Sequence, residues 1–189
     1  DVYGQLLIYK KMLQNVVSNI NKNYISKPYN YEGYFKYSRQ VDGQEKVKEA
    51  TVTIYDAQGY HREDVASAFK ELNYKFNQVR RNSEVTSVWD GLTYFDDILT
   101  ADIVRNTRNV LDIVNSRDYK LKSKGKLVYE GDSVQVISYQ ATHPSISTTG
   151  DPAVQTYSGE IYVNLKDLAV LKNVVNLTSR DFNGLGRNL

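Results

Sequence analysis

The chain has two histidines, His61 and His143, and imidazole is the side chain most often used for proton transfer and metal binding near neutral pH. Both lie in segments where we expect loops. A histidine-based metal site would need both of them together with carboxylates, and the spacing of these residues does not indicate such a site. We therefore predict that both histidines are exposed, without a chemical role, and that the protein holds no metal and no cofactor.

Adjacent carboxylates occur at Glu63-Asp64 and at Asp96-Asp97. Each pair comes where we expect a helix to begin, and negative charge is favourable there because it faces the positive end of the helix dipole. The chain has no serine-nucleophile elbow, zinc-protease motif, phosphate-binding loop or dinucleotide-binding motif. These observations predict no enzymatic activity and no catalytic residues. A glycan hydrolase with two carboxylates from separate strands stays open as an alternative.

The stretch from Tyr119 to Leu127 contains a lysine at every second position. These are Lys120, Lys122, Lys124 and Lys126. In a strand, this period of two places the four lysines on one face, and Tyr119, Leu121 and Leu127 on the other. A line of ammonium groups could follow an anionic polymer or lipid head groups. We expect a solvated face instead, and the net charge of +2 gives no reason to expect nucleic acid as a partner.

Tyrosine is unusually frequent, with 16 residues against five phenylalanines and one tryptophan. Its flat apolar ring and polar tip suit a half-buried sheet face, which is the simplest explanation for the excess. The functional alternative is an aromatic surface for sugars or amphiphiles. Our candidates for lining a ligand site are six residues of the expected strands: Tyr31, Tyr34, Tyr37, Tyr119, Leu121 and Tyr139.

The expected elements indicate an α+β fold. Apolar residues at spacings of three and four predict an amphipathic helix over residues 4–23. Alternation and turn signals predict seven strands, at 29–39, 46–55, 74–81, 119–127, 133–141, 156–165 and 169–177. A short helix or an irregular excursion is expected at 63–73, and a helical segment at 95–114. We predict a curled, half-barrel-like antiparallel sheet of about seven strands, packed on the N-terminal helix and on the mid-chain helical segment.

Residues 1–178 are expected to form one domain, followed by a flexible C-terminal tail at 179–189. The loop at 142–155 is long for such a sheet, and it is either a binding loop or simply mobile. The chain begins with Asp1, has no cysteine and has no apolar run long enough to span a membrane. We interpret it as a processed or excised segment, with any signal or anchor outside it.

Three segments resemble a known family. They are Asn23-Tyr-Ile-Ser-Lys-Pro-Tyr-Asn-Tyr-Glu-Gly-Tyr-Phe35, Lys48-Glu-Ala-Thr-Val-Thr-Ile-Tyr55, and Gly159-Glu-Ile-Tyr-Val163 with Asp167-Leu-Ala-Val170. Over about residues 5–177 the chain resembles the module that follows a carboxypeptidase-regulatory-like domain in Bacteroidetes cell-envelope proteins. Its end is more distantly similar to the half-barrel lipoprotein carriers. The resemblance implies a periplasmic or outer-membrane-associated location and no catalytic residues.

Three functions remain open. The first is a non-enzymatic periplasmic or cell-envelope module that binds an apolar, lipid-like or amphiphilic ligand in the concavity of the sheet. The second is a protein–protein interaction module of an envelope assembly, and the third is the glycan hydrolase. What fills the apolar side of the last strands discriminates between the first two: a helix that fills it favours the partner-binding module, and a space beside the helix favours the ligand binder.

Overall fold

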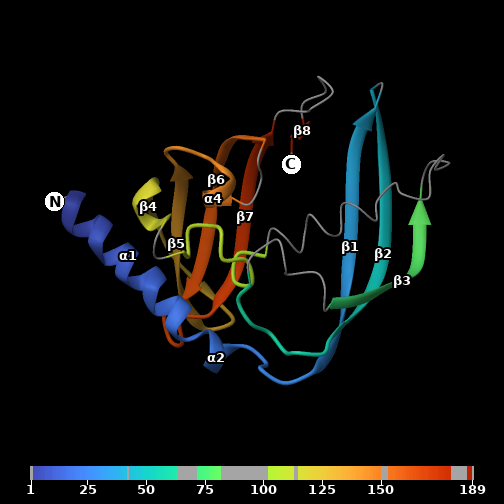
Figure 1. Cartoon of the computed structure of the whole chain (residues 1–189), viewed down its shortest axis with the longest axis horizontal. Helices are drawn as coiled ribbons and strands as arrows, with labels where there is room; N and C mark the ends of the chain where they lie inside the picture. The colour runs from blue at the N-terminus through green and yellow to red at the C-terminus, as the bar shows by residue number, and fades with distance from the viewer. Residues whose placement is uncertain are drawn as a thin grey trace.

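The computed structural model describes residues 2–41, 43–63, 72–81, 102–112, 115–149, 153–179 and 187–188. They form two antiparallel sheets, one long helix and several short helical elements, so the predicted α+β class is confirmed, together with seven long strands. The first sheet has the order β1-β2-β3, and the second has the order β4-β5-β6-β7-β8 (Figure 1). The seven long strands are therefore divided between two sheets and do not form the one curled sheet that alternation suggested. Alternation identifies strands, but it does not determine which strand edges meet.

The first sheet begins with a hairpin of β1 (Tyr29–Val41) and β2 (Gln44–Asp56), followed by β3 (Leu72–Arg81). Gly43 in the hairpin turn has a φ of 75°, a conformation that glycine adopts without strain. One face of the sheet is apolar and buried, with Phe35, Val52 and Ile54 each at most 3% exposed. Phe35 also meets Phe76 of β3 edge-on. The alternation of the sequence therefore produces a sheet with one covered and one wet face.

The second sheet comprises β4 (Tyr119–Tyr129), β5 (Asp132–Ala141), β6 (Val154–Asn164), β7 (Val170–Ser179) and the two-residue β8 (Arg187–Asn188). Glu130 and Gly131 join β4 to β5, and both have positive φ, as a two-residue type I′ hairpin turn requires. Residues 187–188, in the segment where we expected a flexible tail, pair with the end of β7. The neighbouring residues of that tail lie outside the described part of the chain.

Helix α1 (Val2–Ser18) and the short α2 (Ile20–Asn23) lie against the second sheet, as the periodicity of residues 4–23 predicted (Figure 1). Leu13, Val16 and Ile20 pack in one core with the second sheet and with apolar residues of the segment 102–112. The remaining short elements are η1 (Asn115–Asp118) and α4 (Ile146–Thr149). No helix in the described part of the chain has the length and apolar character needed to cross a membrane.

The mid-chain helical segment predicted at 95–114 is wrong where it can be compared. Residues 102–112 form turns and bends, because three side chains take hydrogen bonds that a helix would give to its backbone carbonyls. Asp102 accepts from the amides of Val104 and Arg105, Asn106 accepts from the amide of Arg108, and Asn109 accepts from the amide of Leu111. Residues 95–101, and the greater part of the helix expected at 63–73, lie outside the described residues.

The loop predicted at 142–155 contains the single-turn helix α4, which Ser145 precedes. The side chains of Thr148 and Thr149 both bond back to the Ser145 carbonyl oxygen, at 3.1 and 2.9 Å. The carbonyl oxygen of Thr148 also accepts a hydrogen bond from the buried hydroxyl of Tyr119. The described part of this loop is therefore fixed to the core, and residues 150–152 are outside the description.

A bulge in β4 changes the predicted lysine face. The register between β4 and β5 shifts between Ser123 and Gly125, and Gly125 has a φ of 103°. Before the shift Lys122 pairs with Ser138, on the face away from the core, whereas after it Lys126 pairs with Gln135. Because a shift of one residue exchanges the two faces, the four lysines do not share one face. For the same reason Leu127 is not on the side of Leu121, and it is 40% exposed.

Candidate functional site

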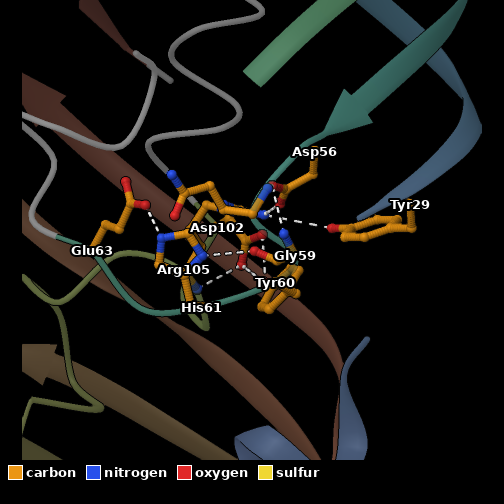
Figure 2. A network of polar contacts seen from close by, with 9 residues as sticks. Tyr29, Asp56, Gly59, Tyr60, His61, Glu63, Asp102 and Arg105 are labelled. Atoms are coloured by element: carbon orange, nitrogen blue, oxygen red, sulfur yellow. Dashed lines mark hydrogen bonds and ion pairs between the residues drawn. The ribbon is translucent and has the colours of Figure 1, made fainter. Parts of the chain in front are cut away.

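Within the described part of the chain, a connected group of polar side chains lies where the first sheet joins the rest of the chain (Figure 2). We call it the junction network, and its labelled members are Tyr29, Asp56, Gly59, Tyr60, His61, Glu63, Asp102 and Arg105. Tyr29 begins β1 and Asp56 ends β2, so these two residues are paired across the hairpin. Asp102 and Arg105 belong to the segment 102–112, whose apolar residues pack in the core of the second sheet. The network therefore connects the two sheets.

At its centre is a buried ion pair between Asp56 and Arg105, whose residues are 1% and 4% exposed. Arg105 Nη2 lies 2.5 Å from Asp56 Oδ2, while Asp56 Oδ1 accepts hydrogen bonds from the amides of Gln58 and Gly59, at 3.1 and 3.0 Å. Burial lowers the pKa of Arg105, but the hydrogen bond and charge of Asp56 outweigh burial and leave that pKa raised. Both carboxylate oxygens of Asp56 thus accept hydrogen bonds, as a buried ion pair requires to offset the cost of its desolvation.

Tyr60 occupies the space between this ion pair and α2. Its ring stacks on Tyr24 with the centroids 4.7 Å apart, and Arg105 Cζ lies 4.7 Å above the ring centroid on a cation–π contact. Its hydroxyl is 2.7 Å from both carboxylate oxygens of Asp102. Burial, and then the charge of Asp102, raise the pKa of Tyr60, so the phenol stays a neutral hydrogen-bond donor.

His61 is at the outer end of the network and is held on both ring nitrogens. Nδ1 is 2.6 Å from the carbonyl oxygen of Gly59, and Nε2 contacts a carboxylate oxygen of Glu63. Glu63 is in turn fixed by its backbone, because its amide donates to the Arg105 carbonyl and its carbonyl accepts from the Thr107 amide. His61 was predicted to be exposed, but it is half-buried between Gly59 and Glu63. Its lack of a chemical role stays a prediction. His143 is exposed, as predicted.

Gly59 is required at its position in the network. Its φ is 83°, and a Cβ placed there would lie 2.6 Å from the carbonyl oxygen of Ser26 and 2.7 Å from the amide nitrogen of Lys27. The amide of Tyr60 donates to the carbonyl of Ile25 at 2.7 Å. The segment after β2 therefore packs directly on the backbone that leads from α2 into β1.

The chemistry open to the junction network is limited by its saturation. Asp56 and Asp102 would be the natural proton acceptors, but backbone amides, Arg105 and Tyr60 already occupy them. Among the residues that the structure describes, no group of three or more acidic or histidine side chains could hold a metal ion. Of the predicted carboxylate pairs, Asp64, Asp96 and Asp97 lie outside those residues. The geometry is that of a structural lock between two sheets.

Three of the six candidate ligand-binding residues are in the core of the second sheet. Tyr119, Leu121 and Tyr139 are at most 8% exposed, and the rings of Tyr119 and Tyr139 pack on each other and on Tyr157. Tyr119 donates to the Thr148 carbonyl at 2.6 Å, and Tyr139 donates to Asn173 Oδ1 at 3.0 Å. These side chains are therefore packed and satisfied within the protein.

The other three candidates are in β1 of the first sheet. Tyr31 pairs with Ile54 on the apolar face and is 41% exposed, whereas Tyr34 pairs with Thr51 on the opposite face and is 66% exposed. Tyr37 pairs with Lys48, and its side chain lies outside what the structure describes. Tyr31 and Tyr34 thus lie on opposite faces of the sheet, and the described candidates do not share one surface.

A small pocket lies beside the buried tyrosines, between α1 and β4. Leu13, Val110 and Leu121 are among the apolar residues that line it, and Lys10 and Asp112 are among the polar ones. Its interior volume of about 10 Å³ has room for about one water molecule. Such a space does not admit an acyl chain. Among the described residues, Leu13 of α1 and Val110 and Leu111 of the segment 102–112 therefore pack closely against Leu121 on this side of the second sheet.

Sequence reasoning missed the junction network, although one part of it has a local signal. Asp56 and Gly59, three residues apart after a strand, are typical of a side-chain-capped turn, and this local signal was available. Arg105 carries no local signal, because its partner Asp56 is 49 positions away in the sequence. No protein-family model matches the chain, and no curated protein matches it either.

Proposed function

We propose that the protein is a non-enzymatic module of the cell envelope that binds a protein partner through the wet face of the β1–β2–β3 sheet. The observation that carries the proposal is the contrast between the two sheets. The tyrosines of the second sheet are buried in its core, whereas the first sheet presents Tyr34 and Tyr55 to solvent at 66% and 43% exposure. The filled core favours partner binding over an amphiphile in the concavity.

The wet face combines exposed rings with a fixed polar surround. Tyr34 pairs with Thr51, and Tyr55 pairs with Asn30. Both tyrosines alternate with the buried residues of their strands, so both point away from the buried face. Between them, Asn77 Nδ2 donates to Thr53 Oγ1 at 3.0 Å, and Thr51 Oγ1 donates to the Asn77 carbonyl at 3.1 Å. Tyrosine is enriched at protein interfaces because it gives a large contact area at a low cost in conformational entropy. The hydrogen bonds among the two threonines and the asparagine hold the backbone and side chains of this face in one conformation before a partner binds.

Charges at the end of this face are already paired. Lys36 Nζ lies 3.8 Å from Glu49 Oε1, and a hydrogen bond to Glu49 raises the pKa of Tyr34. The surface is therefore nearly neutral at this point, which suits a protein surface better than an anionic polymer. The absence of catalytic activity is supported by the saturation of Asp56 and Asp102, whose oxygens are committed to structural hydrogen bonds.

Affinity capture with a matched variant tests this proposal. The full chain is used as bait in solubilised envelopes of its own source, beside a Tyr34→Ala/Tyr55→Ala variant. The control is Val128→Ala/Tyr129→Ala, which removes side chains that are 73% and 53% exposed on the other sheet. We expect recovery of one partner to fall at least tenfold with the first variant and to be unchanged with the control. Equal recovery by all three baits would contradict the proposal.

A further inference from the structure

The edges of the two sheets are protected to different degrees. Unpaired backbone groups at a sheet edge are a template for another strand, and proteins block such edges with bulges and charges. The edge strand β4 has the bulge at Gly125 and its lysines, and the edge strand β3 has Gln78 at a φ of 49° beside Arg80. The end of β7 is paired with β8.

Strand β1 differs from the edge strands β3 and β4 in its length and regularity. It runs for 13 residues and pairs with β2 at every position from Tyr29 to Val41 without a register shift. It contains no proline, and within the described residues its strand partner is β2 alone. A long, regular edge strand of this kind is suited to strand addition.

The sequence of β1 is complementary to itself in the antiparallel direction. When two copies are aligned with Tyr34 opposite Tyr34, Glu32 of each copy lies opposite Lys36 of the other. Residues 32, 34 and 36 share the wet face, because alternate residues of a strand point to the same side. Directly opposite side chains in an antiparallel pair have Cβ atoms about 4.5–5.5 Å apart, which is within reach of an ion pair. The same alignment places Gly33 opposite Phe35, a small residue opposite a large one.

The three side chains are available for these contacts. Glu32 and Tyr34 are exposed, and the side chain of Lys36 is 53% exposed. Its contact with Glu49 is long, at 3.8 Å, and an ammonium group has three donors, so it can serve a second carboxylate. Two identical ion pairs flank the central tyrosines, which is the arrangement that a two-fold symmetric contact produces.

We propose that two copies of the chain associate through β1, antiparallel and centred on Tyr34, and join their first sheets into one six-stranded sheet. The contact uses the edge of the sheet and leaves Tyr55 on the wet face, so it goes beyond the partner surface proposed above. The symmetric ion pairs between Glu32 and Lys36 set the register, because a slip of two residues would separate them.

Charge reversal tests the contact by sedimentation velocity of the full chain over a range of concentrations. Glu32→Lys and Lys36→Glu each place like charges opposite one another twice, and each should weaken association at least tenfold. The double variant Glu32→Lys/Lys36→Glu exchanges the charges and should restore association. Lys75→Glu, a charge reversal in β3, should leave it unchanged. A chain that stays monomeric at every concentration, or a double variant that does not recover, would overturn the proposal.

A single cysteine provides a second measurement that does not depend on affinity. The chain has no cysteine, so a disulfide formed by Tyr34→Cys must join two copies. The position lies opposite itself in the proposed pair, where antiparallel Cα atoms are about 4.5–5.5 Å apart and permit a disulfide. The control is Tyr55→Cys, on the same face but in the central strand. Rapid oxidation of the first variant alone supports the edge contact, whereas faster oxidation of the control would overturn it in favour of contact between faces.

Discussion

The guanidinium of Arg105 lies between the carboxylate of Asp56 and the ring of Tyr60, with the Tyr29 hydroxyl 3.5 Å away. These contacts join a side chain from the core of the second sheet to both strands of the β1–β2 hairpin. Residues of these types often act in catalysis, but here both carboxylate oxygens of Asp56 accept hydrogen bonds within the protein and Arg105 is held by Asp56 and Tyr60. These contacts therefore form a structural lock. We expect removal of a side chain of this lock to change stability and not a chemical step.

Breaking the buried pair is expected to be costly. Arg105→Met leaves the carboxylate of Asp56 buried without its counter-charge, and removal of one partner of a buried ion pair costs about 3–5 kcal/mol. Urea unfolding at neutral pH measures the change. The matched control is Lys124→Met, at the exposed Lys124–Glu160 pair, which should change stability by about 0–1 kcal/mol. Equal effects of the two substitutions would show that the junction pair does not hold the sheets together.

Buried tyrosines predict a loss of stability at high pH. Burial raises the pKa of Tyr157 from 10.0 to about 12, because the phenolate would lose its hydration in the core. Unfolded tyrosine loses its proton first, so the stabilisation by the neutral phenol is complete below pH 10 and is lost as the pH rises toward 12. Unfolding free energies measured from pH 8 to 12 should fall over that interval. In Tyr157→Phe the fall should be smaller by about 2–3 kcal/mol, since each pKa unit corresponds to about 1.4 kcal/mol.

At the scale of elements, the second sheet depends on close contacts between neighbouring strands. Gly159 in β6 pairs with Tyr139 in β5 and Val175 in β7. The ring of Tyr139 covers the glycine, and a Cβ at this position would overlap both the Tyr139 phenol and the Val174 carbonyl oxygen. The glycine thus allows the central tyrosine to lie flat in the core.

Gly159→Ala should therefore destabilise the protein by about 1–3 kcal/mol, the usual cost of overpacking a core. The comparison variant is Gly33→Ala in β1, where a Cβ would meet Val52 Cγ1 at an ordinary 3.6 Å. That substitution should be neutral or slightly stabilising, because alanine loses less conformational freedom than glycine on folding. Thermal unfolding monitored by circular dichroism compares the two. A Gly159→Ala variant as stable as Gly33→Ala would contradict the packing described for β6.

The elements themselves could be predicted from alternation and turn residues, and the helix over residues 4–23 could be predicted from its apolar spacing. The bulge in β4 could not, because Gly125 in a run of lysines leaves the alternation of residue types unchanged while the faces exchange. The turns at 102–112 were hidden by apolar residues at helical spacing, although Asp102 and Asn109 gave a signal of their own. The partition of the strands into two sheets, and the pairing of Asp56 with Arg105, depend on long-range contacts that no local pattern encodes.

At the scale of the whole molecule, two sheets of different character are joined by one network. The second sheet has buried tyrosines and α1 in its core. The first sheet presents a wet aromatic face and the regular strand β1, whose strand partner among the described residues is β2 alone. A single domain over residues 1–178 and a flexible tail after it remain predictions, as does the cell-envelope location. In the function proposed here, the recognition surface belongs to the first sheet and not to the second.

We expect the two sheets to unfold as one cooperative unit, because the junction network places Arg105 of one core against Asp56 of the other sheet. Scanning calorimetry of the full chain should give a single transition, with equal calorimetric and van't Hoff enthalpies. In Arg105→Met the same measurement should give a lower transition temperature. Two transitions in the unaltered chain would show that the two sheets unfold independently and that residues 1–178 do not form one domain.

Site-specific photo-crosslinking tests the central claim most directly, since it reports which surface a partner touches in the intact envelope. A photoreactive phenylalanine analogue is placed at Tyr55 on the wet face of the first sheet, and at Tyr129 on the second sheet as the control. We predict that the Tyr55 position forms an adduct with a distinct protein and that the Tyr129 position does not. Equal adducts from both positions, or lipid adducts from the Tyr55 position in place of a protein, would contradict partner binding through the β1–β2–β3 sheet.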